Sequence, residues 1–343
     1  MIPFTIELLA KTSLILALGL CVAAALRGAT ASLRHLVLLA TLGGALVLPV
    51  AMTLSPNWDV ALFPAATTTA LANATDPNAA LSKNPGSPGV VGESRTPSAR
   101  NQRDASVPLV VGVQSPSTGT AGMARTNAGN ASTSRWSVTT LLISLWSLGF
   151  LGIAAWLVTG RVRLARIART SWPLTDPDWT NVLDRARAEA AVRKDVLLCS
   201  SPAVSTPLTW GVRAPVILLP EDAVDWKDDH RHIVLRHELA HVARSDSLTQ
   251  LLAGIVCALY WFHPFAWIAE RRLRAECERA CDDRVVSLGT PGPEYASHLL
   301  EVARSARAFG AAGFLSVAMA RPSQLEGRLL AVLNESRRRA SIS

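Results

Sequence analysis

The chain has 343 residues, of which 49% are hydrophobic, and a formal net charge of +8. This length accommodates one folded domain plus membrane segments, and the apolar content is high for a purely soluble protein. The five cysteines show no paired spacing, so a disulfide-stabilised secreted scaffold is not indicated.

Three apolar stretches are long enough to cross a membrane. The first two occupy residues 6–26 and 36–54, and the third is an uncharged run in residues 136–160. A cleaved signal peptide ending near Ala29 is the alternative for the first stretch, but a second span follows almost at once. We therefore predict a mainly α membrane protein with three transmembrane helices, two of them within residues 1–54.

Basic residues lie beside these spans, and their distribution predicts the topology. They are Arg27, Arg34, Arg161, Arg163, Arg166 and Arg169. The positive-inside rule places the loop between the first two spans, and the chain after the third, in the cytoplasm. Direct nucleic-acid binding is not expected, because we find no basic helix face interleaved with aromatic residues.

Residues 55–135 are rich in Ala, Thr, Ser, Asn, Pro and Gly and contain few large hydrophobic residues. Such a segment cannot bury enough apolar surface to offset the entropy of ordering, so we predict a disordered extracytoplasmic loop. Residues 161–295 are predicted to form a cytoplasmic domain, and residues 296–343 a helical, basic tail.

Within that domain the patterns predict helices at 178–193 and 228–244, a short strand at 195–199 and a hairpin at 207–220. A later helix is expected to run to about Leu288, with Gly289 as its stop.

An H-E-x-x-H motif lies on the helix predicted at 228–244. His237 and His241 are four residues apart, so both imidazoles can reach one metal ion. Zn²⁺ accepts such ligands and acidifies a water molecule, and Glu238 is placed to take a proton from that water. The alternative is a helix with two surface histidines. His230 and His232 are interpreted as solvated residues near the helix start.

A catalytic zinc site also needs a third protein ligand. The downstream candidates are His263, Glu270, Glu276, Glu278, Asp282 and Asp283. Spacing alone does not choose among the acidic candidates. If Glu278 is the ligand, it lies on the same side of the membrane as His237. The apolar segment 247–270 would then be a helical hairpin that dips into the membrane and breaks at His263-Pro264.

Four pieces of the sequence resemble the BlaR/MecR-type integral-membrane zinc peptidases of bacteria, which are gluzincin-like enzymes. They are Leu33-Arg34-His35, the segment 207–220, His237 to His241 with Arg244 and Asp246, and Trp261 to Pro264 with Glu278 to Asp282. The resemblance implies an α+β zinc peptidase domain in the inner (cytoplasmic) membrane of a bacterial cell. No penicillin-binding sensor domain is recognisable after these pieces, and residues 309–319 are too short for a final span.

The resemblance also implies roles for individual residues. His237, His241 and Glu278 would bind Zn²⁺, and Glu238 would act as general base. Asp282 and Asp246 would orient ligands. Thr209, Trp210, Gly211, Val216 and Ile217 would form an edge that binds a substrate strand.

The predicted activity is that of a zinc metalloendopeptidase in a signalling response. Its expected partners are membrane lipid and a protein or peptide substrate, which the resemblance implies is a cytoplasmic repressor or the receptor itself. A homodimer is left open. The competing predictions are a non-catalytic membrane signalling protein that keeps the fold, and a zinc hydrolase with a non-peptide substrate.

Overall fold

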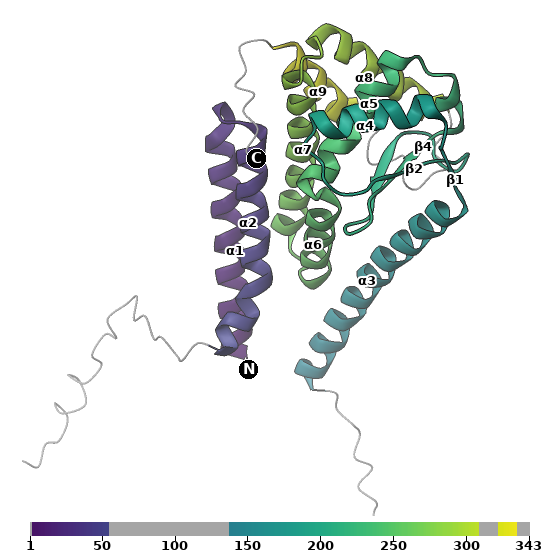
Figure 1. Cartoon of the computed structure of the whole chain (residues 1–343). Coiled ribbons are helices and arrows are strands. Elements are labelled where there is room, and N and C mark those ends of the chain that lie inside the picture. Colours follow the sequence, from purple (N-terminus) through teal and green to yellow (C-terminus); the bar gives the residue numbers. More distant parts are fainter. Residues whose placement is uncertain (1, 55–136, 309–321, 335–343) are drawn as a thin grey trace, which may run out of the picture. The chain divides into compact units, whose positions relative to one another are not determined.

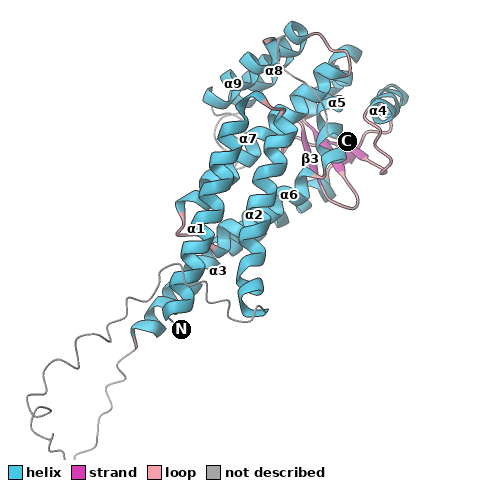
Figure 2. Ribbon diagram, turned by 90° about the vertical axis from the view of Figure 1, so that its left-hand side faces the viewer, coloured by secondary structure: helices cyan, strands magenta, loops and turns pink. Residues whose placement is uncertain are grey.

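The computed structural model describes residues 2–54, 137–308 and 322–334, and helices dominate these ranges (Figures 1 and 2). The predicted loop at 55–135, the apolar run at 309–319 and the last residues of the predicted tail, 335–343, lie outside the described residues.

Three described helices are long and apolar enough to span a membrane. They are α1 (Ile2–Ala25), α2 (Ala31–Leu54) and α3 (Val138–Thr170), and a single 3₁₀ turn (Leu26–Gly28) precedes α2. In addition, α5 (Asp228–Arg244) and α6 (Asp246–Leu259) would give a fourth span if this pair, bent by 58°, were one crossing.

Helix α3 is longer than its predicted span. The apolar part expected to end at residue 160 continues without a break through the Arg-rich segment to Thr170. Arg, Leu and Ala are strong helix formers, so loss of apolar character does not end the helix. The boundary predicted at 161 therefore falls inside a helix.

A small four-stranded sheet follows α3. Its strands are β1 (Trp172–Pro173), β2 (Leu197–Ser200), β3 (Leu208–Trp210) and β4 (Val216–Leu219), in the order β1-β2-β4-β3. β2 and β4 are parallel, whereas β3 and β4 form the antiparallel hairpin predicted at 207–220. The helix predicted at 178–193 is α4 (Pro177–Glu189), which ends earlier than expected.

The two faces of the sheet contribute to different clusters because neighbouring side chains in a strand point to opposite sides. Ile217 and Leu219 are fully buried in a core shared with α4 and α5. Leu218, between them, is buried against the last turns of α3 through Leu164 and Ile167. The sheet is thus covered on both faces, and α5 is fixed against it.

The remaining helices are α7 (Pro264–Ser287), α8 (Gly292–Ala308) and α9 (Pro322–Leu333), and a 3₁₀ segment (Glu221–Asp225) precedes α5. Helix α7 ends where predicted: Leu288 is its C-cap, and Gly289 has φ +101°. Glycine adopts this left-handed conformation without a Cβ clash.

Helices α6 and α7 share a hydrophobic core with α1 and α2. Leu16, Leu42, Val256 and Leu273 represent the four helices in that core. The chain breaks between α6 and α7 at residues 260–263, next to Pro264 as predicted. This irregular backbone is covered by neighbouring helices: His263 is hydrogen-bonded to Ser13 (2.8 Å), and Tyr260 donates to the Ala45 carbonyl (3.0 Å).

Candidate metal centre

Helix α5 presents the H-E-x-x-H residues on a rigid support. Leu235 and Leu239 on its opposite side are fully buried against the sheet and α4, which fixes the rotation of the helix. His237 and His241 lie one turn apart, with ring centroids separated by 5.0 Å and planes at 86°. Both rings can therefore direct a nitrogen toward one point beside the helix.

Glu278 on α7 faces the same point. One carboxylate oxygen lies 3.7 Å from His237 Nε2, and the other lies 3.9 Å from His241 Nε2. One donor atom from each of the three residues lies within 4.8 Å of the others. This is the donor set that the resemblance implied.

The other candidate ligands face different partners. Glu276 forms a buried ion pair with Arg34 (2.6 Å), and Glu270 pairs with Arg274. Asp282 accepts hydrogen bonds from Tyr295 and Arg328. Sequence spacing could not identify the third ligand among these acidic residues, because the residue that faces His237 depends on how α7 packs against α5.

The hydrogen bonds of the two imidazoles leave both Nε2 atoms available to a metal. Tyr295 donates its single hydroxyl proton to Asp282 (2.7 Å), so it can only accept from His237 Nδ1 (2.8 Å). The Asp246 carboxylate likewise accepts from His241 Nδ1 (2.9 Å). Each ring is therefore assigned a proton on Nδ1, and its Nε2 atom faces Glu278.

Burial and charge support this assignment. Burial and the adjacent Asp282 carboxylate raise the pKa of Tyr295, so its hydroxyl remains protonated. Burial opposes ionisation of Asp246, but the hydrogen bond from His241 and the charge of Arg244 lower the pKa of Asp246 below its ordinary value. Asp246 therefore stays a carboxylate and an acceptor.

A left-handed residue brings Asp246 to His241. Ser245, between α5 and α6, has φ 55° and ψ 40°, and this conformation turns the chain sharply. Two buried thiols complete the surroundings of His241 Nδ1: Cys281 Sγ at 3.4 Å and Cys277 Sγ at 3.8 Å. Both cysteines are buried and both contact this ring.

The residues present fit a bound zinc ion. Glu278 Oε2 is buried and accepts no hydrogen bond, although Arg328 Nη1 lies 3.1 Å away. Burial disfavours the charged form of Glu278, whereas the charge of Arg328 favours it, and the pKa of Glu278 lies well below its ordinary value. A carboxylate with a buried oxygen that accepts no hydrogen bond, close to two imidazole Nε2 atoms, is a donor set suited to Zn²⁺.

Glu238 is buried next to these ligands and is held by the edge strand. Thr209 on β3 donates to Glu238 Oε2 (2.8 Å) and lies 3.1 Å from the Glu238 carbonyl. The Thr209 hydroxyl thus contacts Glu238, a contact that the sequence did not predict. Trp210 lies beside Arg161 of α3, whose guanidinium is 5.7 Å from the ring centroid.

The predicted substrate-binding edge is only partly an edge. β3 pairs with β4 on one side, and no other described strand pairs with it. Val216 and Ile217 lie on β4, which pairs with β2 and β3 on its two sides, so they cannot form an edge. The prediction was wrong here because the hairpin pattern does not tell which strand faces the rest of the sheet. Gly211, with φ +97°, belongs to the turn between β3 and β4.

Three further residues near the site were not predicted. Tyr295 and Arg328 come from α8 and α9, which carry no motif, and only the packing of these helices brings them to Glu278 and His237. His230 was interpreted as solvated but is buried, because α8 covers the start of α5. We know of no sequence pattern that would have indicated these contacts.

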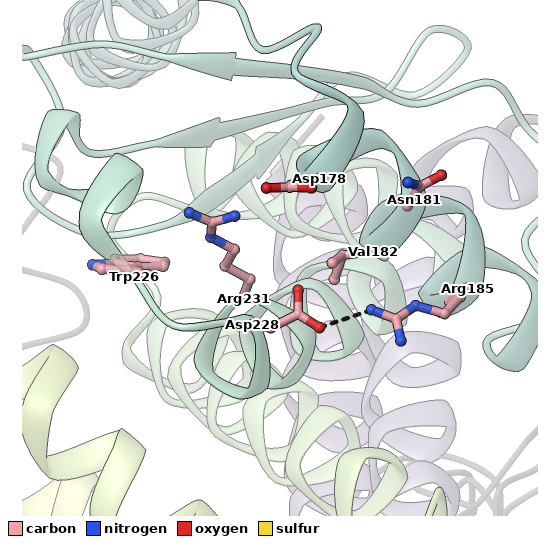
Figure 3. A pocket seen from close by; sticks show the side chains of 7 residues that line it. All are labelled: Asp178, Asn181, Val182, Arg185, Trp226, Asp228 and Arg231. Atoms are coloured by element: carbon pink, nitrogen blue, oxygen red, sulfur yellow. Dashed lines mark hydrogen bonds and ion pairs between the residues drawn. The ribbon is translucent and has the colours of Figure 1, made fainter.

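Two surface pockets differ in their relation to these residues. A small one, bordered by His237, Glu238, Tyr295 and Arg328, adjoins the candidate metal centre. A wider one lies between α4 and the start of α5 (Figure 3). Its side chains include the ion pair Arg185–Asp228 (2.9 Å), and it includes none of the proposed metal ligands.

Comparison with known proteins agrees with this geometry. The family model described as BlaR1 peptidase M56 matches residues 52–332. This chain belongs to that family. It is 28% identical over 138 residues to the regulatory protein BlaR1 of Bacillus licheniformis, a match covering 39% of this chain and 23% of the relative. It is 26% identical over 97 residues to the methicillin resistance mecR1 proteins of Staphylococcus aureus and Staphylococcus epidermidis, covering 28% of this chain and 17% of each relative.

The matches thus span less than a quarter of the length of these curated relatives. Membership of the M56 family, together with three apolar helices, supports a membrane protein of the metallopeptidase and signalling type.

Proposed function

We propose that the chain is a multi-pass membrane zinc metalloendopeptidase that cleaves a cytoplasmic or membrane-proximal protein in a signalling response. The observation that carries the proposal is the convergence of His237, His241 and Glu278, with both Nε2 atoms close to the Glu278 carboxylate and Glu238 beside them. The BlaR1 family match supports the same activity, and a repressor or the chain itself is the substrate class that we propose.

In this proposal His237, His241 and Glu278 hold the metal. When bound, Zn²⁺ polarises a peptide carbonyl and lowers the pKa of a water molecule. Glu238 takes the proton of the attacking water and delivers it to the leaving amine, and Thr209 holds the carboxylate in position for both transfers. Asp246 orients His241 directly, whereas Asp282 orients His237 through Tyr295.

The edge strand β3 is the proposed docking site for the substrate. Its free edge can bind an extended peptide by adding a strand to the sheet. Thr209 lies on this strand and contacts Glu238, so a peptide paired with β3 would run past the general base. In this proposal Trp210 and Gly211 remain part of the docking strand and its turn.

The topology that we propose places the metal centre on the cytoplasmic side of the inner membrane. Arg161, Arg163, Arg166 and Arg169 follow the apolar part of α3 and supply the positive charge expected there. Arg34 is buried and paired with Glu276, so it is not counted among the flanking positive charges that indicate the cytoplasmic side. Helices α6 and α7 then form a hairpin that enters the membrane beside α1 and α2, with which they share a core.

The test uses the full chain purified in detergent and an unfolded model protein as substrate. Replacing Glu238 with Gln should leave bound zinc unchanged and reduce hydrolysis by roughly 10²–10⁴-fold, the usual contribution of a general base. The matched control is Glu221→Gln, on the surface segment before α5, which should retain full activity. Unchanged hydrolysis by a folded, zinc-loaded Glu238→Gln variant would refute the proposed mechanism. A wild-type protein that binds no zinc would favour the non-catalytic signalling protein.

A further inference from the structure

A second group of side chains that could hold a metal ion lies outside the H-E-x-x-H centre. It consists of His230 at the start of α5 and His298 and Glu301 on α8. The two Nδ1 atoms are 3.0 Å apart, and Glu301 Oε2 lies 3.3 Å from His230 Nδ1 and 3.9 Å from His298 Nδ1. Three donor atoms from two helices therefore point at one another.

These separations match those around a metal ion. Tetrahedral zinc with bonds of about 2.0–2.1 Å to nitrogen and oxygen separates its ligand atoms by about 3.3–3.4 Å. The measured values bracket this spacing, and they are as short as those between His237, His241 and Glu278. The distances between donor atoms in the second group are therefore compatible with a shared ion.

The surroundings suit neutral imidazole ligands. Burial and the neighbouring His298 lower the pKa of His230, despite the acidic groups Glu301 and Asp222 nearby. His230 stacks against Trp226 with ring centroids 4.4 Å apart, which fixes its orientation. Glu301 is exposed, so an ion can enter from solvent, and water can occupy a fourth position.

The position of the group connects it to the first centre. His230 and His237 are seven residues apart, which places them two turns apart on one face of α5. Tyr295 and His298 are three apart on α8 and contact His237 and His230 respectively. A small pocket is lined by both His237 and His298. An ion at the second group would join α5 to α8 along the contact that holds Tyr295 against His237.

We propose that His230, His298 and Glu301 form a second binding site for zinc or another late first-row divalent cation, and that this site fastens α8 to α5. Imidazole and carboxylate ligands suit this class of ion. The site does not depend on the proposed peptidase activity, and it shares no ligand with the first centre.

The test counts zinc bound to the full chain in detergent after metal removal and equilibration with buffered Zn²⁺ near neutral pH. The wild type should bind two ions, and His298→Ala and Glu278→Gln should each bind one. The double variant should bind none, and the neighbouring control Ser297→Ala should bind two. One ion in the wild type that is lost in Glu278→Gln, or two ions in His298→Ala, would overturn the proposal.

A second measurement guards against a variant that fails to fold. In the Glu278→Gln background, added Zn²⁺ should raise the thermal unfolding temperature, because an ion that binds only the folded state stabilises it. Adding His298→Ala to that background should abolish the rise, whereas Ser297→Ala should not. Equal rises in both variants would show that the stabilising zinc binds elsewhere.

Discussion

Asp246 provides a sharp test of how the metal centre is supported. It is almost fully buried, and it accepts a hydrogen bond of 2.9 Å from the Nδ1 of His241. A hydrogen bond to a charged group contributes about 1.5–3 kcal/mol. Since about 1.4 kcal/mol corresponds to a tenfold change in affinity, Asp246→Ala should weaken zinc binding by roughly 10–100-fold.

Asp246→Asn should have the smaller effect, because an amide oxygen can still accept from His241 but carries no charge. Among the described residues, the other hydrogen-bond neighbours of His241 Nδ1 are the thiols of Cys277 and Cys281, which are weak acceptors. The control is Asp184→Asn, whose carboxylate lies on the exposed side of α4 and makes an ion pair with Arg187. It should bind zinc as the wild type does.

Zinc affinity is measured by competition with a chromophoric chelator, and thermal unfolding confirms that each variant is folded. Asp246 also lies near Arg244 (3.4 Å), so Asp246→Ala should lower stability as well, which makes Asp246→Asn the cleaner variant. A folded Asp246→Ala protein that binds zinc as tightly as the wild type would show that this hydrogen bond does not orient the ligand.

Other predictions concern His237, the core, acid stability and the metal. Tyr295→Phe removes the acceptor for His237 Nδ1 and should weaken zinc binding about tenfold in the same competition assay. Ile217→Ala should cost about 2–5 kcal/mol in denaturant unfolding, because the side chain is fully buried. A hydrogen bond from Arg236 lowers the pKa of Glu189 below 4.5. The ionised Glu189 therefore contributes fully to the free energy of unfolding above that pH, and its contribution is lost as pH falls through the lowered value. In denaturant unfolding at a series of acidic pH values, Glu189→Gln should make stability depend less on pH than in the wild type. Chelation should abolish hydrolysis, and added Zn²⁺ should restore it.

Local patterns predicted the parts of the fold that depend on neighbours in sequence. The α5 helix and the stop at Gly289 follow from periodicity and capping, and the break before Pro264 follows from the missing amide of proline. The hairpin at 207–220 was also predicted, because its two strands are neighbours in sequence. The extension of α3 was missed because the prediction equated the end of apolar character with the end of the helix.

Contacts between distant segments could not be predicted in this way. Arg34 was interpreted as a flanking charge of a membrane span, yet it is buried against Glu276, which lies 242 residues later. Thr209 was assigned to substrate binding, whereas its hydroxyl contacts Glu238. In both cases the sequence singled out the residue but could not identify its partner, because the partner is determined by how helices and strands pack.

The start of α2 connects the membrane helices to the metal centre through three such contacts. Besides the Arg34–Glu276 pair, Ser32 accepts a hydrogen bond from Arg244 (3.3 Å), and His35 lies 4.0 Å from Asp246. Breaking a buried ion pair typically costs about 3–5 kcal/mol, because one charge is left without a partner. A shift of α2 that separated Arg34 from Glu276 would therefore be opposed strongly. Since Asp246 orients His241, and Glu276 precedes the ligand Glu278 by only two residues, such a shift would also disturb two of the three proposed metal ligands. A physical route from the membrane helices to the proposed metal ligands thus runs through the start of α2.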